Sequence, residues 1–294
     1  MAMRLWHNAG MARQRGAALL IALLVVALAA LLAVELIERS QRDIARTTGV
    51  VNAERGWQYA EGMEGLARAW IRRQREAGAG ISLPEGQWSQ AFVVPGGTVR
   101  GRMVARDGRF NLNALASPDP AVASEARRTL SGLLELLDID PALAEDIQSL
   151  FGPGAGGGRI TLAHLSELNR LERYGAAARD RLAPYLAVLP DPGARINVNR
   201  ARPEVLAAAV EGLALDAARR LVARAPFETL DAVLASPELA RLNATALRRL
   251  LSVQSEWFLV QARVVLDGIV RDYFRLVGTS GSRYDFRYLS QGVP

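Results

Sequence analysis

The chain has 294 residues, of which 50% are hydrophobic, so it is long enough to form about two domains with buried cores. It contains no cysteine, which excludes disulfides, cysteine nucleophiles and cysteine-based metal sites. The net charge is +6 and all 36 cationic residues are arginines, and their scattered pairs indicate solvated helix faces rather than a nucleic-acid groove.

The N-terminal region combines a basic cluster with a long uncharged segment. Arg13 and Arg15 come directly before residues 16–34, which carry no charge and as a helix would span roughly the hydrocarbon core of a bilayer. Mixed charges follow from Glu35 onward, so the positive-inside bias places the N-terminus in the cytoplasm. We therefore expect a single-pass membrane anchor, with nearly all of the remaining chain outside the cytoplasm.

Three interpretations of this region differ in where the chain is cut. A prepilin-type leader would be removed between Gly16 and Ala17, upstream of the apolar helix, whereas an ordinary anchor would stay uncleaved. A secretory signal would be cut after Ala29, but its hydrophobic core is usually about 7–15 residues long, and here the apolar run continues beyond that point. This order favours the prepilin-type leader, with the start left open between Met1 and Met11.

The helix is expected to continue past the membrane. Residues 36–75 contain no proline, and their apolar residues keep a helical spacing. The residues with this spacing are Ala60, Met63, Ala67, Trp70 and Ile71. The glycines that can soften or kink this helix are Gly49, Gly56 and Gly62. The prediction is one long helix, with its membrane part over residues 17–36 and its outer part over residues 37–75.

The next segment has the pattern of a β-hairpin. A Pro-Gly-Gly turn at residues 95–97 separates two runs rich in β-branched and aromatic residues, one beginning at Trp88 and the other at Thr98. In the second run Val99 and Met103 alternate with arginines, which indicates one buried face and one wet face.

The middle of the chain, from about residue 117 to residue 251, is predicted to be helical. Asp140 and Ser236 each precede a proline, a pattern typical of helix N-caps. The glycine-rich stretch 152–158 lacks the Lys-Ser/Thr of a phosphate-binding loop and is expected to be a connector. Strand patterns return at residues 257–266, 269–277 and 284–289.

These patterns predict an α+β fold with a pilin-like long N-terminal helix and an antiparallel sheet that a large all-helical insert interrupts. The expected segments are a leader at 1–16, the membrane part of the helix at 17–36, its periplasmic part at 37–75, the first part of the sheet at 76–115, the helical insert at 116–251, and closing strands at 252–294. The second half of the insert, residues 195–251, has a helix-hairpin-helix-like, SAM-like pattern.

Three motifs give the chain a specific resemblance. They are Phe-Asn-Leu-Asn-Ala-Leu at residues 110–115, Ile-Asn-Val-Asn at 196–199 and Leu-Ser-Val-Gln-Ser at 251–255. Together with the leader, the long helix and the helical insert, they resemble the minor pseudopilin K (GspK) family of type II secretion, nearly from end to end. The leader alone is shared by all pilins, so the first motif and the insert carry the resemblance.

The resemblance implies a function in assembly rather than chemistry. A K-family protein is expected at the tip of the periplasmic pseudopilus, in complex with the I and J minor pseudopilins, where it initiates assembly and supports export of folded proteins. It implies an inner-membrane location, cleavage by prepilin peptidase between Gly16 and Ala17, and methylation of the new amine. In this interpretation Gly16 is required at the site, and Arg13 and Arg15 keep the cut on the cytosolic side.

Ile21 would be the fifth residue of a chain that starts at Ala17. Major pilins and most pseudopilins resemble one another in carrying glutamate there, which can neutralise the N-terminal amine of a neighbouring subunit. An acid in mid-bilayer costs about 2.5–3.5 kcal/mol on the insertion scale and persists only beside a compensating charge. A subunit at the filament end has no such amine, so apolar Ile21 fits a tip subunit; the alternative is a simple lipid-facing position.

Three residues on the outer helix are candidate packing residues for assembly, namely Trp57, Met63 and Trp70. The alternative, which the sequence favours, is that they are buried under the sheet of the same chain.

Calcium binding is left open. Some relatives of this type carry an Asp-rich loop that binds calcium, but here residues 152–158 form a short glycine-rich connector instead. Calcium takes six to eight oxygen ligands from a converging loop. The available candidates are Asp138, Glu145 and Asp146, with Asp140 engaged as a cap, so no cofactor is expected and calcium is doubtful.

A second function class comes from the resemblance of residues 195–251 to helix-hairpin-helix DNA-uptake modules, which would make the chain a membrane-anchored DNA receptor. Such modules present the backbone of a Gly-hydrophobic-Gly hairpin to a phosphate. Here the hairpin is Gly212-Leu213-Ala214, so the second glycine is missing, and Glu211 adds a repelling charge. The arginines that could reach a phosphate are Arg219, Arg220 and Arg224. No nucleic acid is therefore expected as a partner.

An enzymatic function has the least support. The two histidines are His7 and His164, and neither lies in a Gly-x-Ser-x-Gly, His-Glu-x-x-His or paired-carboxylate motif. The sequence predicts no catalytic residue.

Overall fold

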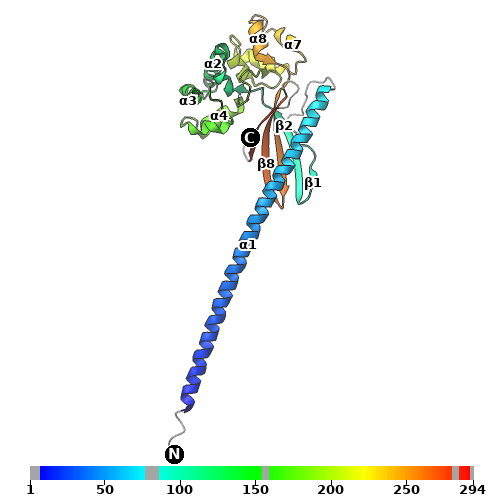
Figure 1. Ribbon diagram of the computed structural model, residues 1–294. Helices are drawn as coiled ribbons and strands as arrows, with labels where there is room; N and C mark the ends of the chain where they lie inside the picture. Colours follow the sequence, from blue (N-terminus) through cyan, green and yellow to red (C-terminus); the bar gives the residue numbers. More distant parts are fainter. Residues whose placement is uncertain (1–6, 77–85, 154–158, 280–284, 292–294) are drawn as a thin grey trace, which may run out of the picture. The chain divides into compact units, whose positions relative to one another are not determined.

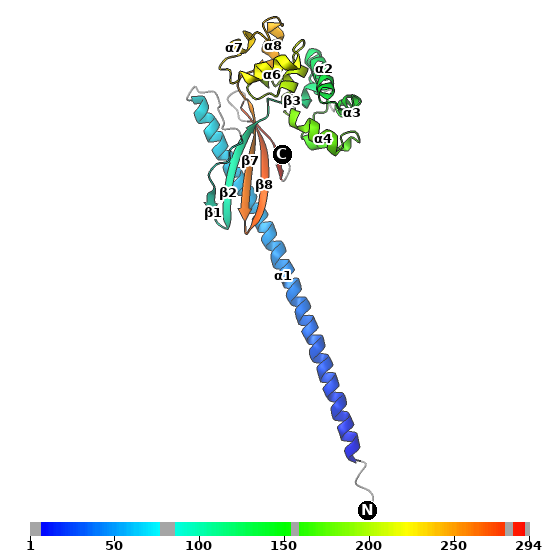
Figure 2. The same cartoon turned by 180° about the vertical axis from the view of Figure 1, so that it is seen from behind.

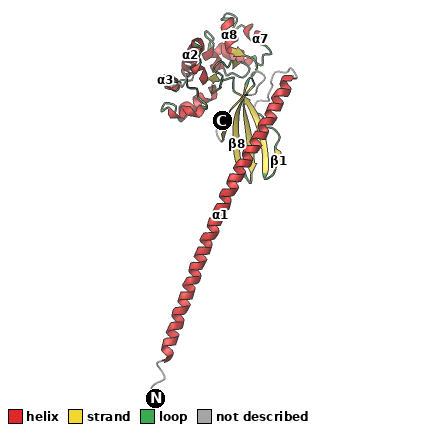
Figure 3. Ribbon diagram, viewed as in Figure 1, coloured by secondary structure: helices red, strands yellow, loops and turns green. Residues whose placement is uncertain are grey.

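The computed structural model describes residues 7–76, 86–153, 159–279 and 285–291, and side-chain burial for residues 20–74, 86–153 and 159–279. The chain divides into two compact units, residues 1–57 and 58–294. Helices and one sheet of longer strands share the second unit (Figure 3). The predicted α+β fold is confirmed, whereas the exact domain boundaries stay a prediction.

Helix α1 (His7–Glu76) is continuous, as its proline-free sequence predicts (Figure 1). The glycines at 49, 56 and 62 do not interrupt it. By length and composition, one helix in the described part of the chain is able to cross a membrane, with a mean hydropathy of 3.0 over its most apolar window. A single glycine costs a helix only about 1 kcal/mol, which explains why the helical hydrogen bonding continues through these positions.

One antiparallel sheet contains five strands in the order β1-β2-β7-β8-β9. The strands are β1 (Phe92–Val94), β2 (Gly97–Ala105), β7 (Trp257–Leu266), β8 (Ile269–Gly278) and β9 (Asp285–Gln291). Strand β2 pairs along its whole length with β7, from Gly97 opposite Leu266 to Ala105 opposite Phe258. Since these two neighbours are far apart in the sequence, the helical region is an insertion into the sheet (Figure 2).

The hairpin of β1 and β2 depends on its glycines. Gly96 has φ +88°, a left-handed conformation that favours glycine. A Cβ atom on Gly97 would lie 1.8 Å from the carbonyl oxygen of Val265, so only glycine fits beside β7 there. The first strand begins at Phe92 rather than at Trp88, because residues 88–91 do not join the ladder.

The C-terminal part of α1 packs on one face of the sheet through two apolar clusters. The first contains Ala60, Met63, Val99, Ala262, Val264, Leu266 and Tyr273. The second contains Ala67, Ile71, Met103, Phe258, Val260 and Val277. The predicted alternation of β2 is therefore correct, with Val99 and Met103 buried and the arginines between them on the other face.

A buried ion-pair network also joins α1 to the sheet. The Glu64 side chain is 5% exposed, and its Oε2 lies 2.7 Å from Nε of Arg275 on β8. Its Oε1 bonds to Arg68 one turn along the helix. The Glu64 carboxylate thus bonds to one arginine of the helix and one of the sheet, and it adds a charged contact to the apolar packing between them.

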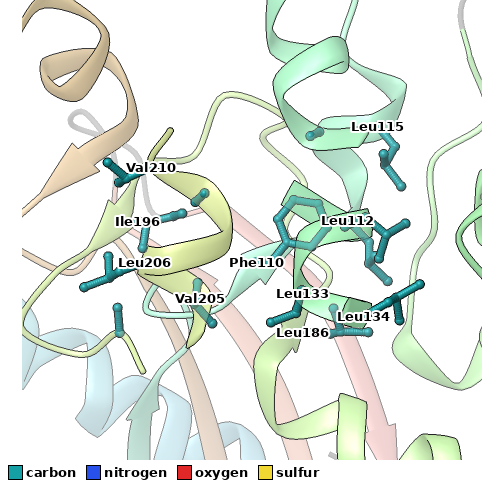
Figure 4. Close-up of a cluster of buried hydrophobic side chains, with 14 of the residues drawn as sticks. Phe110, Leu112, Leu115, Leu133, Leu134, Leu186, Ile196, Val205, Leu206 and Val210 are labelled. Atoms are coloured by element: carbon teal, nitrogen blue, oxygen red, sulfur yellow. The ribbon is translucent and has the colours of Figure 1, made fainter. Parts of the chain in front are cut away.

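The helical region is built as two successive modules around one core (Figure 4). The first module contains β3 (Phe110–Asn111), η1 (Leu112–Ala116), α2 (Pro120–Leu136), α3 (Leu143–Ser149), η3 (Leu165–Arg170), α4 (Ala176–Leu182), η4 (Ala183–Tyr185) and β4 (Leu186–Ala187). The second contains β5 (Ile196–Asn197), α5 (Pro203–Ala209), α6 (Leu215–Ala223), α7 (Leu230–Leu234), α8 (Ala244–Leu250) and β6 (Leu251–Ser252). Each module opens and closes with a short strand, and the two strands pair in parallel.

The insert is thus not all-helical, and buried asparagines explain the short strands. Asn113 donates from Nδ2 to the carbonyls of Leu162 and Leu189, at 3.0 and 2.9 Å, and accepts from Leu162 N at 2.8 Å. Asn199 makes the same kind of clamp on Phe227 and Val253. Because these amides satisfy backbone groups that no helix reaches, they hold extended segments inside the core.

Two of the predicted helix caps differ from the structure. Asp140 accepts from Ala142 N at 2.9 Å, but α3 begins only at Leu143. Ser236 does not cap a helix: its hydroxyl donates to the carbonyl of Val233, and residues 236–240 form turns. The hydroxyl bonds backward to the preceding turn and the residues after Pro237 form only turns, so the pattern predicted a helix that does not form.

Asp107 joins the sheet to the inserted modules. It follows β2 and is 2% exposed; its Oδ2 accepts from Glu256 N at 2.6 Å, and its carbonyl accepts from Asn197 N at 2.8 Å. Burial raises the pKa of Asp107 to about 6, against the opposing effect of hydrogen bonds from Glu256 N and Ser255. Asp107 therefore links the end of β2 to the start of β7 through its carboxylate and to the start of the second module through its backbone carbonyl.

Candidate functional site

The apolar part of α1 is the first candidate region. Large side chains from Leu20 to Val34 are more than half exposed, and Ile21 is 63% exposed. A run of exposed apolar side chains of this length requires an apolar environment, either lipid or other helices. This feature fits a single-pass membrane anchor.

The predicted processing residues precede this exposed run. Gly16 and Ala17 lie within the helical backbone of α1, as do Arg13 and Arg15. The side chains of all four lie outside the described residues, so their role in processing stays a prediction.

The three candidate assembly residues on α1 differ in burial. Met63 is 7% exposed and lies in the first cluster under the sheet, and Trp70 is half-buried against the second cluster. Trp57 is 40% exposed. Packing within the same chain therefore accounts for Met63 and in part for Trp70, while a role in assembly stays a prediction for all three.

The helix-hairpin-helix pattern corresponds to α5, a turn and α6. Gly212 in the turn has φ +81°, which explains the glycine in the motif. The three arginines that could contact phosphate are each paired with a carboxylate: Arg219 lies 2.9 Å from Asp216, and Arg220 and Arg224 both bond to Glu238. A phosphate would have to displace these carboxylates, so the geometry favours a packing module over a DNA site.

The calcium candidates do not converge. Asp146 accepts two hydrogen bonds from Arg173, at 2.8 and 3.1 Å, and Asp138 lies 3.6 Å from Arg181. Glu145 is exposed on α3. Within the described ranges, no group of three or more histidine and acidic side chains is placed to hold a metal ion. Asp138 and Asp146 are instead paired with different arginines.

His164 has a structural position. It is the N-cap of η3, where its Nδ1 accepts from Ser166 N and the Glu167 side chain accepts from His164 N at 3.0 Å. This reciprocal capping box explains a lone histidine in the helical region without a catalytic role.

Known proteins of one family are similar to this chain in sequence and in fold. A profile of the type II secretion system (T2SS) protein K family matches residues 196–254. The type II secretion system protein K of Klebsiella pneumoniae is 34% identical over 291 residues, which cover 86% of this chain and 89% of that protein. The chain belongs to the type II secretion system protein K family.

Further similarities agree with this family. The protein K of Pseudomonas aeruginosa is 33% identical over 67% of this chain and 68% of its own length, and that of Pectobacterium carotovorum is 28% identical over 86% and 88%. A crystal structure of the GspK-GspI-GspJ complex from enterotoxigenic Escherichia coli superposes with a TM-score of 0.69 at 21% identity, covering 85% of this chain and 100% of that chain. The last comparison shows a shared fold.

Family membership gives the chain a minor pseudopilin role in type II secretion. The family is a component of secretion machinery and not an enzyme family. The resemblance in the Asn-x-Asn motifs also has a physical basis, because buried Asn113 and half-buried Asn199 clamp backbone groups of distant segments. Sequence reasoning used the motifs but missed this role, although their recurrence at residues 110–113 and 196–199 was a signal of two similar modules.

Proposed function

We propose that this chain acts at the tip of the periplasmic pseudopilus, where it initiates assembly with the minor pseudopilins I and J and supports export of folded proteins across the outer membrane. One helix anchors it in the inner membrane with the N-terminus in the cytoplasm and the bulk of the chain in the periplasm. Its role involves no catalysis, cofactor or nucleic acid. Family membership and the shared fold with a protein crystallised with GspI and GspJ support this proposal.

The observation that best supports a position at the tip is that residue 21 is an apolar isoleucine. Counted from Ala17, it occupies the position where most pseudopilins have the glutamate that pairs with a neighbouring amine. At the end of a filament that amine is absent, and an unpaired acid in an apolar environment would cost about 2.5–3.5 kcal/mol. An isoleucine avoids this cost.

Processing is tested by intact mass and N-terminal sequencing of the protein from membranes, with and without an active prepilin peptidase. We expect a mature chain that starts at Ala17 only when the peptidase is active. Gly16→Ala should block the cut, whereas Gly49→Ala, a matched helical glycine with open space around it, should not. An uncleaved wild-type chain, or one that starts after Ala29, would refute the pseudopilin route.

The tip position is tested by comparing Ile21→Glu with Leu24→Glu, two exposed apolar positions one turn apart. At a tip neither glutamate finds an amine, so both variants should lower secretion of a reporter substrate by the same factor at equal levels of mature protein. If Ile21→Glu is tolerated and Leu24→Glu is not, the subunit has a neighbour that supplies an amine, and the tip position is wrong.

The partners are tested by co-purification from detergent-solubilised membranes. The tagged full chain should elute with minor pseudopilins I and J at a salt concentration that removes non-specific nucleic acid, since DNA affinity falls steeply with salt. Recovery of DNA without I and J would refute the proposed partners and favour the DNA-receptor alternative.

A further inference from the structure

The sheet has a second face, opposite α1, which Figure 2 shows toward the viewer. Along β2 the residues that alternate with buried Val99 and Met103 lie on this open face, and they include Arg100 and Arg102. Both arginines are only partly buried. Near the inserted region this face is covered, because Trp257 and Leu276 are buried against Ala187 and Leu189, but around Arg100 and Arg102 it presents positive charge.

Cross-strand pairs extend this charged surface onto β7, with a second arginine, and onto β8, with an aspartate. Arg100 lies opposite Arg263, and Arg263 lies opposite Asp272, so all three share one face. Arg263 donates two hydrogen bonds of 2.8 Å to Asp272. Arg102 donates from Nε to Oε1 of Gln261 at 2.6 Å. These bonds fix the orientation of two guanidinium groups, which are therefore preorganised.

Trp88 covers the arginines. Its position is set by Ser89, whose N–H donates to the carbonyl of Gly101 at 2.8 Å and whose hydroxyl accepts from Gly101 N at 3.1 Å. The centroid of the Trp88 ring lies 4.7, 4.8 and 4.9 Å from the guanidinium carbons of Arg100, Arg102 and Arg263. We call these four residues the Trp88 cluster.

The Trp88 cluster has more positive than negative charge. In the part of the chain that the structure describes, one carboxylate bonds to an arginine of the cluster, namely Asp272 to Arg263. Within the same ranges the Arg100 guanidinium makes no hydrogen bond and only contacts the ring. Three cations held around one ring with a single bonded anion form a surface that is complementary to further carboxylates.

We propose that the Trp88 cluster is a docking surface for an acidic, extended polypeptide segment of a protein partner. Arg100 and Arg102 are two residues apart on a strand, which separates them by about 6.6–6.8 Å. Carboxylates at alternate positions of an extended chain have the same spacing. The guanidinium forks bind carboxylates in a bidentate manner, and the half-buried indole supplies apolar contact between them.

The composition of the cluster favours a polypeptide over a simple anion. Tryptophan and arginine are the residues most enriched among those that dominate protein interfaces. The three guanidinium groups surround one point, but the Trp88 ring occupies it, so a single free anion cannot take that place and carboxylates have to bind along the outer sides of the groups. The surface is independent of the tip position, because it depends on neither Ile21 nor the processing site.

The test uses the full chain in nanodiscs of neutral lipid and a fluorescein-labelled peptide of alternating glutamate and serine, read by fluorescence anisotropy. Wild type should bind this peptide and not the peptide with glutamine in place of glutamate. Arg100→Glu with Arg102→Glu should weaken binding by about tenfold or more. The same double variant should gain binding of the peptide with lysine in place of glutamate, which also shows that it is folded.

The matched control is Arg127→Glu with Arg170→Glu, two exposed arginines in the helical region that give the same change in net charge. If both double variants lose affinity equally, only net charge matters and the proposal is wrong. Glycerol phosphate, the soluble headgroup of an anionic lipid, is the competitor. If it displaces the acidic peptide at the same concentration of negative charge, the cluster is a general anion surface and a polypeptide partner is refuted.

Discussion

Asp107 should make the stability of the protein depend on pH in an unusual direction. Its carboxyl group is 2% exposed, and burial raises its pKa from 3.8 to about 6. Between these values the native state binds more protons than the unfolded state, so the free energy of unfolding falls as pH rises from about 4 to 6. At about 1.4 kcal/mol per pKa unit, the loss approaches about 3 kcal/mol and is complete above pH 6.

Asp107→Asn should remove this dependence. The asparagine oxygen can still accept from Glu256 N, as Oδ2 does now at 2.6 Å, while its amide nitrogen takes the place of Oδ1, which has no hydrogen-bond partner among the described residues. The new unpaired donor costs about 1–3 kcal/mol, which offsets part of the gain at neutral pH. In the variant, the contribution of residue 107 to the free energy of unfolding should not change with pH. The stability of the variant at pH 7 should be close to or above that of wild type.

The assay is urea unfolding of the full chain in detergent micelles from pH 4 to pH 7, followed by near-ultraviolet circular dichroism. Asp272→Asn is the control with the opposite sign, because the hydrogen bond from Arg263 lowers the pKa of Asp272. That carboxylate contributes stability above its unfolded pKa, which is lost as pH falls. Identical pH profiles for wild type and Asp107→Asn would refute the reasoning.

Other changes should separate buried contacts from exposed ones in the same unfolding assay. Glu64→Ala removes a buried carboxylate that bonds to Arg68 and Arg275 and should cost about 2–3 kcal/mol, whereas Glu61→Ala on the exposed face of the helix should stay within about 0.5 kcal/mol. Asn113→Ala breaks three hydrogen bonds of a buried clamp and should cost about 3 kcal/mol or more, with exposed Asn169→Ala as its neutral counterpart. Gly97→Ala forces a Cβ against a backbone oxygen of β7, so soluble yield and hairpin hydrogen-exchange protection should both drop; wild-type protection would contradict the predicted clash.

The elements with strong local signals were predictable from sequence. Helix α1 follows from a long stretch without proline and a regular apolar spacing, and β2 from strict alternation around Val99 and Met103. Both signals depend only on residues that are close in the sequence, so they can be recognised without knowing the rest of the fold. The membrane anchor was predictable for the same reason.

The parts that depend on distant contacts were not predictable. From the sequence alone Asn113 resembles a loop residue, and its role follows only from its hydrogen bonds to Leu162 and Leu189. Ser236 has the sequence pattern of a helix cap, but in the fold its hydroxyl bonds to the preceding turn. The sequence pattern predicts Trp88 at the start of a strand, whereas its ring lies over arginines from two strands that are far apart in sequence. Such roles follow from tertiary neighbours, which a local pattern does not contain.

The pairing of Ala105 with Phe258 means that the chain leaves the sheet and returns to it at adjacent positions. Seen from the sheet, the whole helical region is equivalent to the loop of an ordinary hairpin. Loop-closure entropy grows only logarithmically with length, and a folded region whose two ends lie side by side shortens the effective loop further. Evolution could therefore enlarge, exchange or delete this region at a single point while every strand keeps its register.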